Sequence, residues 1–356
     1  SNAFGQARKT TRRQRLAGSL PSCMREAGYN VHPEQLLMAE TEVYGLISGP
    51  SWLRQSLVAD FEDLGYVKNP YDKCIMTLPP RAGKDRCPAS ASRSLGDLAL
   101  YLTVGIILIE VDDLLEGGEP AHAKAMERFY GKYKCAKRKR LVDPGNEGTL
   151  ISGIRFRQLK DYSFIWDMQE YADDKLKPLE PPRGLISTTK ELDDKWIGQI
   201  LACNGKIGWL GSNGRPDIAA GHSIIAGKVK DKSPELITLC NQVVKQVKSV
   251  KVQMKIWPIG VADIRFVAFV DSSFDHAGGR HQQGYIVGFT NQFLNQNRPA
   301  PVSIALWRSR KLPRKAGSPQ LVETYAASYG TAEMNWVRCI FTVSYTHLTL
   351  PTNREV

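Results

Sequence analysis

The chain has 356 residues, of which 42% are hydrophobic and 24% are charged, and its formal net charge is +12. The hydrophobic content excludes a disordered chain and is enough for two or three packed domains. The excess of basic residues favours a polyanionic partner, nucleic acid first and an acidic membrane surface second, over the plainer alternative of a soluble protein with a basic surface.

The cysteines and the apolar runs bear on the cellular compartment. Seven cysteines are spread along the sequence without a Cys-x-x-Cys pair or a histidine at zinc-finger spacing. This pattern predicts a reduced, intracellular protein with buried or incidental thiols. Separately, we expect no signal peptide. The most apolar run, residues 98–109, has 12 residues and includes a glycine, so it is too short to span a bilayer. The sequence therefore predicts no membrane partner.

The first predicted element is an amphipathic helix over residues 51–64. Its apolar residues fall on one stripe, and Gly65 follows as a helix stop. Residues 74–78 are a candidate strand. Residues 79–97 are rich in Pro, Gly, Ser and Arg, and this composition predicts a loop.

A hairpin is predicted in the next segment. A buried strand over residues 98–109 runs into the acidic turn Glu110-Val-Asp-Asp113, and a second short strand follows and ends at the pair Gly117-Gly118. Strand, turn and strand predict a hairpin with carboxylates at its tip. Pro120 then begins a predicted helix that ends at about Tyr133.

The remaining sequence predicts a linker and then a compact β-rich region. Residues 174–190 are rich in Pro and Lys and predict the linker, whereas the Gly-rich stretch 200–228 is ambiguous. Ser318-Pro319 supplies a cap and a first turn for a helix to about residue 340. Strands are predicted before it at residues 264–270, 284–290 and 302–307. The last third therefore predicts a β-β-β-α order, and the whole chain an α/β (α+β) fold.

Asp112 and Asp113 form the first candidate site. Two adjacent acids at a strand end repel each other, and a divalent metal relieves that repulsion. Mg²⁺ prefers oxygen ligands, usually one or two carboxylates together with substrate phosphates. Two such ions about 4 Å apart stabilise the attacking and the leaving oxygen of phosphoryl transfer. The plainer alternative is a solvated acidic turn.

Asp271 and Glu323 form the second candidate site. Asp271 is predicted where strand 264–270 ends, and Glu323 lies in the first turns of the following helix. Packing of that helix on the sheet would bring both acids to one metal centre. The plainer alternatives are a turn aspartate and an exposed helix glutamate. His276 and His281 also lie near Asp271 and raise the weaker hypothesis of a zinc site, although no further ligand pair is evident.

Several segments, in chain order, resemble those of copia-type retrotransposon polymerases. Glu110–Asp113 resembles the family's Tyr-Val-Asp-Asp box, and Leu150–Phe156 resembles one of its strands. The other segments are Val43–Leu46 with Gly49, Pro50 and Trp52; Asn213–Ile218; Asp271–Gly279 with Gly284 and Tyr285; Leu306–Lys311; and Val322–Ala327. Their collinear order over residues 43–338 is more specific than any single segment.

The resemblance implies an RNA-directed DNA polymerase with RNase H activity. Asp112 and Asp113 would be two of the three polymerase carboxylates. Asp271 and Glu323 would be the first two of four RNase H carboxylates, and Mg²⁺ would be the cofactor at both sites. The implied partners are an RNA template, a DNA primer, an RNA–DNA hybrid and deoxynucleoside triphosphates, held by salt-sensitive phosphate contacts. The implied location is a cytoplasmic particle or the nucleus.

The resemblance also implies an organisation along the chain. Residues 1–173 would form a partial reverse transcriptase with parts of fingers, palm and thumb. Residues 174–262 would form a linker or connection, and residues 263–341 a truncated RNase H-like domain. Residues 343–356 resemble a translated sequencing adapter, so the fold prediction leaves them out.

Departures from the family bear on activity. Ser1-Asn-Ala-Phe4 resembles the end of the segment that opens with the third polymerase aspartate, which would then lie two residues before Ser1. The further RNase H acids would follow residue 338. Glu110 stands where the family usually has tyrosine, and Ser48 replaces a glutamine. We therefore expect little or no catalysis by this chain, because losing one member of a catalytic unit costs orders of magnitude in rate.

Other functions stay open. One alternative is a degenerate, non-catalytic remnant of a mobile element that binds nucleic acid with a steep salt dependence. Another is a two-metal nuclease built on Asp271 and Glu323 alone, which would cleave hybrids without polymerisation. A third is a host interaction protein that uses its basic surface and has no preference for a hybrid over a simple polyanion.

Overall fold

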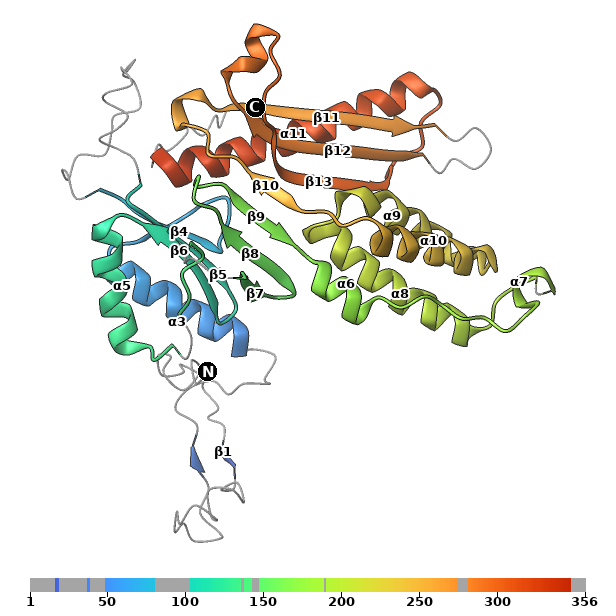
Figure 1. Cartoon of the computed structure of the whole chain (residues 1–356), viewed down its shortest axis with the longest axis horizontal. Helices are drawn as coiled ribbons and strands as arrows, with labels where there is room; N and C mark the ends of the chain where they lie inside the picture. The colour runs from blue at the N-terminus through green and yellow to red at the C-terminus, as the bar shows by residue number, and fades with distance from the viewer. Residues whose placement is uncertain are drawn as a thin grey trace. The chain divides into compact units, whose positions relative to one another are not determined.

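The computed structural model describes residues 17–18, 37–38, 49–80, 103–135, 138–142, 147–188, 190–274 and 281–346 (Figure 1). The chain divides into two compact units. The first is drawn from residues 1–138 and 339–356, and the second covers residues 139–338. Helices and antiparallel sheets are mixed in both, as expected for the α+β class. Within the described ranges, no helix is long and apolar enough to cross a membrane.

The first unit contains a four-stranded antiparallel sheet in the order β3-β4-β5-β6. The strands are β3 (Val67–Lys68), β4 (Ile75–Leu78), β5 (Gly105–Glu110) and β6 (Asp113–Gly118). The predicted strand at 74–78 and the predicted hairpin are therefore confirmed. Most of the predicted loop 79–97 and the first residues of the predicted strand 98–109 lie outside the described part. A separate short pair joins β1 (Ala17–Gly18) to β2 (Leu37–Met38).

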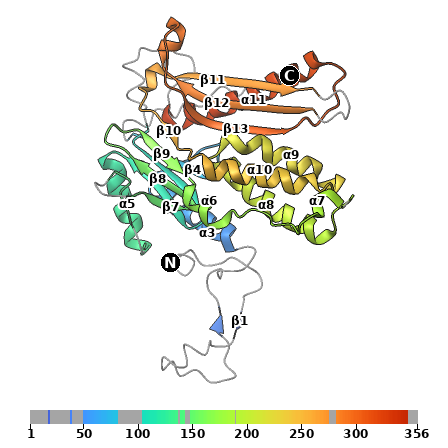
Figure 2. The same cartoon turned by 45° about the vertical axis from the view of Figure 1, so that its right-hand side comes forward.

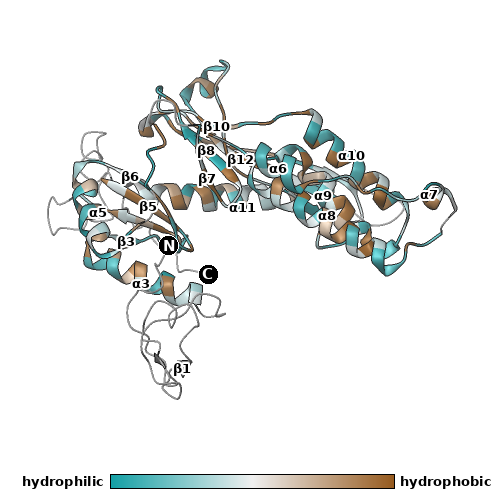
Figure 3. Cartoon of the chain, turned by 60° about the horizontal axis from the view of Figure 1, so that its bottom comes forward, coloured by the Kyte–Doolittle hydropathy of each residue, from teal (hydrophilic) through white to brown (hydrophobic). Residues whose placement is uncertain are grey.

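Two helices supply the rest of the first unit, α3 (Gly49–Asp63) and α5 (Pro120–Lys132), and both were predicted. Hydrophilic and hydrophobic residues alternate along them (Figure 3). Gly65 ends the α3 segment with φ +97°, a backbone conformation that suits glycine. The apolar stripes of both helices pack with alternate residues of β5 in one core, which includes Leu53, Phe61, Ile107, Ile109, Met126 and Phe129.

The second unit begins with a four-stranded antiparallel sheet in the order β10-β9-β8-β7. Its strands are β7 (Thr149–Ile151), β8 (Ile154–Gln158), β9 (Phe164–Asp167) and β10 (Met254–Ile256). The resemblance predicted one strand over Leu150–Phe156, and this prediction is wrong. Ser152 and Gly153 have φ +51° and +84°, so the chain reverses there and forms a two-residue hairpin turn.

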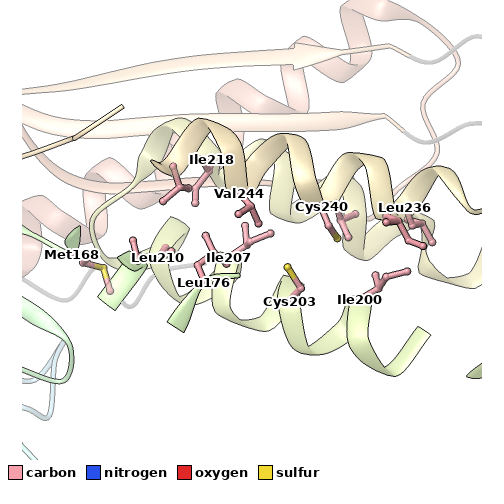
Figure 4. Close-up of a cluster of buried hydrophobic side chains, with 14 of the residues drawn as sticks. Met168, Leu176, Ile200, Cys203, Ile207, Leu210, Ile218, Leu236, Cys240 and Val244 are labelled. Atoms are coloured by element: carbon pink, nitrogen blue, oxygen red, sulfur yellow. The ribbon is translucent and has the colours of Figure 1, made fainter. Parts of the chain in front are cut away.

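A helical layer follows this sheet, and its main helices pack around one hydrophobic core (Figure 4). The sequence left most of the layer unassigned, because residues 200–228 are rich in glycine. Residues 176–184 of the predicted linker lie outside regular elements. The helices are α6 (Gln169–Lys175), α7 (Leu185–Thr188), α8 (Asp194–Asn213), α9 (Ala219–Lys228) and α10 (Glu235–Ser249), with 3₁₀ turns at Pro216–Ile218 and Val229–Asp231.

The predicted β-β-β-α order is confirmed. Strands β11 (Arg265–Ser273), β12 (Gln282–Thr290) and β13 (Ser303–Lys311) form an antiparallel sheet in that order, and α11 (Pro319–Thr346) follows. Short 3₁₀ turns precede and interrupt the strands at Val261–Asp263 and Gln292–Gln296. One face of the sheet carries α11 (Figure 2), where Gly330 packs against Val270.

The end of α11 lies beyond the predicted limit at residue 340. The helix continues to Thr346, and from Cys339 it belongs to the first unit. There Asn69 donates a hydrogen bond to the Ser344 hydroxyl at 2.8 Å. Residues 347–356, the larger part of the segment that resembles an adapter, lie outside the described residues.

Candidate functional site

The turn between β5 and β6 presents the first pair of predicted acids. Glu110 pairs with Asp113 across the ladder, so Val111 and Asp112 form a two-residue loop. The side chains of Asp112 and Asp113 are both exposed. The prediction of a hairpin with carboxylates at its tip is therefore confirmed. Ile109 is buried in the core on the other face, so strand alternation directs Glu110 and Asp113 away from that core.

The electrostatics of this tip are unfavourable for the chain alone. Glu110 and Asp113 lie directly opposite each other, and like charges in that position destabilise a strand pair. Partial burial and the negative charge of Asp112 raise the pKa of Asp113 above its ordinary value. A divalent cation at the tip would relieve both effects. The donor set, exposed carboxylate oxygens next to one another, fits Mg²⁺.

The loop backbone is also strained. Val111 has φ +53°, a region that a β-branched residue rarely occupies. The first loop residue of a two-residue hairpin needs a positive φ. Glycine is favoured there because it has no Cβ to clash with the backbone. Strain of this kind costs on the order of 1–3 kcal/mol and is concentrated at functional sites. Here it lies directly before Asp112.

We expect Val111→Gly to stabilise the hairpin by about 1 kcal/mol, because it removes this strain at an exposed position. Urea unfolding of the variant and the wild type measures the difference. Val67→Gly is the control, since Val67 is equally exposed but lies within a strand, where glycine weakens pairing. Destabilisation by both substitutions would show that the Val111 backbone is not strained.

A buried polar network lies on the core side of the same hairpin, and the sequence did not predict it. The imidazole of His122 contacts the Tyr66 hydroxyl at 2.8 Å through Nδ1 and the Glu116 carboxylate at 2.9 Å through Nε2. Tyr130 donates to the other Glu116 oxygen at 2.6 Å. A proton on His122 Nε2 satisfies both ring nitrogens. The Arg138 guanidinium lies 3.7 Å from the Tyr130 ring centroid and 3.6 Å from Glu116.

Charge and burial compete within this network. Burial raises the pKa of Glu116, but the hydrogen bonds from His122 and Tyr130 outweigh it and hold the pKa below the ordinary value. Burial raises the pKa of Tyr66, and the charge of Glu116 adds to that effect. Burial and the hydrogen bond to Glu116 likewise raise the pKa of Tyr130. Glu116 is therefore ionised and both tyrosines stay protonated donors at neutral pH. The network fastens β6 to α5 and so holds the hairpin in place.

Two glycines make room for the His122 ring. Gly105 and Gly118 lie opposite each other in the β5–β6 ladder. A Cβ on Gly105 would lie 2.3 Å from His122 Nδ1, and one on Gly118 would lie 2.7 Å from His122 Cβ. The pair Gly117-Gly118 was visible in the sequence as a strand end. Its partner His122 was not, because nothing local links a helix histidine to a tyrosine 56 positions before it.

The second predicted pair of acids is arranged differently. β11 continues to Ser273, so Asp271 lies within the strand, opposite Gly284, and not at its end. Val270 faces α11, and alternation places the exposed Asp271 on the opposite face of the sheet. Glu323 is exposed on α11, next to the buried Val322. The structure therefore does not direct Asp271 toward the helix that carries Glu323.

The weaker zinc hypothesis finds no support in the described residues. His276 lies outside them. His281 is buried and stacks on the Phe274 ring, with 4.6 Å between the centroids. In the part of the chain that the structure describes, no three His, Cys, Asp or Glu side chains are grouped so that they could hold a metal ion. The hairpin pair is the better candidate because its exposed carboxylates are adjacent.

The segment Asn213–Ile218 has a structural role that the resemblance did not reveal. Arg215 is 3% exposed and donates two hydrogen bonds to Asp217, at 2.9 and 2.8 Å. It donates a third to the Val247 carbonyl at 3.1 Å, near the end of α10. Gln246 completes the arrangement with a bond to Asp217 at 3.2 Å. This ion pair, between a buried arginine and an aspartate at the surface, joins the turn after α8 to α10.

Comparison of the sequence with models of known protein families finds no match, and comparison with curated proteins finds none either. The family resemblance therefore depends on the order of the motifs alone. The geometry of the hairpin is an independent observation. It supports a metal-binding role for the carboxylates, but it does not identify the family.

Proposed function

We propose that the chain is part of an RNA-directed DNA polymerase with an RNase H region, of the copia retrotransposon type. The observation that carries the proposal is the exposed Asp112–Asp113 pair at a strained two-residue turn, directly after a buried strand. The collinear order of the resembling segments over residues 43–338 supports the same assignment. The formal net charge of +12 suits a template and primer of nucleic acid.

In this proposal, Asp112 and Asp113 would hold Mg²⁺, and the phosphates of a deoxynucleoside triphosphate would supply further oxygen ligands. The metal would supply charge stabilisation for the attacking and leaving oxygens of phosphoryl transfer. The Tyr66–His122–Glu116 network lies on the core side of the hairpin. It would position the hairpin without contacting the substrate. The partners would be an RNA template, a DNA primer and their hybrid, in a cytoplasmic particle or the nucleus.

We further propose that this chain has little or no catalytic activity of its own. Within the described ranges, the hairpin acids have no third ligating side chain grouped with them. Asp271 lies on the face of its sheet away from α11 and Glu323, which disfavours hybrid cleavage at that pair. These observations also favour the alternative of a degenerate, non-catalytic nucleic-acid-binding remnant. The polymerase assignment and the remnant differ in one expectation: only the polymerase assignment expects Mg²⁺ to take part in nucleic-acid binding.

The test is the substitution Asp112→Asn in the full chain. We expect the wild type to bind an RNA–DNA hybrid more tightly in Mg²⁺ than in EDTA, by several-fold, and the variant to lose that difference. Fluorescence anisotropy with a labelled hybrid, repeated over a salt series, measures Kd and its salt slope. Primer extension on an RNA template, measured in parallel, should stay near background for both proteins.

Glu127→Gln is the charge-matched control, because Glu127 is an exposed acid on α5 in the same unit. It should keep the Mg²⁺ effect. Hybrid binding that is indifferent to Mg²⁺ in the wild type would favour the non-catalytic remnant. Equal affinity for the hybrid and for heparin would favour the host interaction protein. Robust extension that Asp112→Asn abolishes would contradict the expected inactivity while supporting the polymerase assignment.

A further inference from the structure

Two cysteines meet in the core of the helical layer. Cys203 lies on α8 and is 5% exposed, and Cys240 lies on α10 and is fully buried. Their sulfur atoms point toward each other from the two facing helices (Figure 4). The two thiols are close enough for each to shift the pKa of the other.

The surroundings of this pair are apolar. Ile200 and Ile207 flank Cys203 on α8, Leu236 and Val244 flank Cys240 on α10, and all belong to the same buried cluster. A free cysteine in such a setting is ordinarily inert, because burial disfavours the thiolate. The neighbouring Cys240 thiol nevertheless lowers the pKa of Cys203 and outweighs its burial, with Lys206 adding to the effect. The Cys203 thiol and burial together raise the pKa of Cys240. Cys203 is therefore the thiol that ionises first.

We propose that Cys203 and Cys240 form a redox-active pair, which a small hydroperoxide oxidises to a disulfide between α8 and α10. The Cys203 thiolate attacks the peroxide, so an S–O bond forms, the O–O bond breaks, and the leaving hydroxide is protonated to water. The Cys240 sulfur then attacks the Cys203 sulfur. An S–S bond forms, the S–O bond breaks, and the thiol proton leaves with the oxygen as a second water. Two thiols and one hydrogen peroxide thus give one disulfide and two waters.

A hydroperoxide is the fitting class of oxidant because the site is nearly closed. A thiol-disulfide reagent would have to fit a mixed disulfide into the packed core, whereas peroxide adds one oxygen atom. The other cysteines in the described residues are placed differently. Cys135 is exposed, and Cys74 and Cys339 are partly buried in the first unit. Cys203 and Cys240 therefore differ from these cysteines in that each already faces another thiol.

The first test is to map the disulfide in the full wild-type chain. Purified protein is treated with hydrogen peroxide or kept in dithiothreitol, its free thiols are alkylated, and its peptides are analysed by mass spectrometry without reduction. We expect one dominant cross-linked species that joins the peptides of Cys203 and Cys240. Free alkylated Cys203 and Cys240 after peroxide treatment, or a higher oxidised form of Cys203 without the cross-link, would overturn the proposal.

The second test is the melting temperature of the same samples. A disulfide that closes the loop between residues 203 and 240 should raise the melting temperature of the second unit by about 5 °C or more on oxidation. Cys240→Ala should lose that rise, and Cys135→Ala should keep it. A rise that persists in Cys240→Ala would show that oxidation acts elsewhere. The mapping on wild-type protein remains decisive should Cys240→Ala fold poorly.

Discussion

Gly118→Ala should destabilise the first unit by about 3 kcal/mol, although the same change one residue earlier should do no harm. A Cβ on Gly118 would lie 2.5 Å from the Val104 carbonyl oxygen and 2.7 Å from His122. Relieving these contacts moves the ring, and overpacking of this kind costs roughly 1–3 kcal/mol. The movement also lengthens the buried hydrogen bonds to Tyr66 and Glu116, and each lost partner costs about 1–3 kcal/mol.

Gly117→Ala is the matched control for this prediction. A Cβ on Gly117 would meet nothing within 4 Å, so the change should be neutral or stabilise by about 0.5 kcal/mol through the loss of backbone freedom in the unfolded chain. Urea unfolding measures both variants, and amide hydrogen exchange in β5 and β6 assigns the effect to this unit. Equal stability of the two variants would mean that the His122 ring does not fill the space above Gly105 and Gly118.

Asp217→Asn should destabilise the second unit by about 3–4 kcal/mol. Arg215 is 3% exposed. Among the described residues, Asp217 is the only carboxylate that accepts hydrogen bonds from it. Asparagine keeps the shape but removes the charge and turns one acceptor into a donor. Removing the carboxylate leaves the buried Arg215 charge uncompensated, which typically costs about 3–5 kcal/mol in a pair buried on both sides. The lower part of that range is expected here, because the Asp217 side chain is 29% exposed.

The control is Asp194→Asn, which removes an acid of the same helical layer. Asp194 pairs with Lys232 at 3.0 Å, but its side chain is 94% exposed, so little change is expected. In the double variant Arg215→Met/Asp217→Asn, the loss should be smaller than the sum of the single losses, because no charge remains buried. Urea unfolding measures the wild type, Asp217→Asn, Arg215→Met, the double variant and the control Asp194→Asn. Additive losses would show that Arg215 and Asp217 do not act as a pair.

The Arg215–Asp217 pair also predicts a pH dependence. Burial raises the pKa of Asp217, but the hydrogen bonds and the charge of Arg215 outweigh it, so the pKa in the folded chain lies below the ordinary value. The unfolded state therefore binds the proton more tightly. The contribution of Asp217 to stability is complete above about pH 4 and is lost as the pH falls through the folded pKa. Asp217→Asn should flatten this part of the stability curve.

Local signals in the sequence were sufficient for the elements that depend on neighbouring residues. The apolar stripe of α3 and its stop at Gly65 were predicted, because helix periodicity and a left-handed stop need no distant contact. The β5–β6 hairpin with its acidic tip and the β-β-β-α order followed from runs of apolar residues between turn residues. The adjacency of Asp112 and Asp113 is set by the chain itself.

The tertiary structure decided the elements and contacts that join distant segments. Four glycines made α8 unpredictable, since each lowers helix propensity by about 1 kcal/mol. In the fold, Gly208 admits the His222 ring and Gly211 lies against Ala219, so packing stabilises a helix that propensity disfavours.

The two candidate sites differ in the same way. Asp112 and Asp113 are neighbours in the sequence, so their arrangement could be predicted. The relation of Asp271 to Glu323 depends on which face of β11 receives α11, and the contact of Gly330 with Val270 settles it. A shift of one residue in the pairing register moves every side chain of a strand to the other face of the sheet. No local pattern in the sequence determines that choice; it is made by the packing of the helix on the sheet.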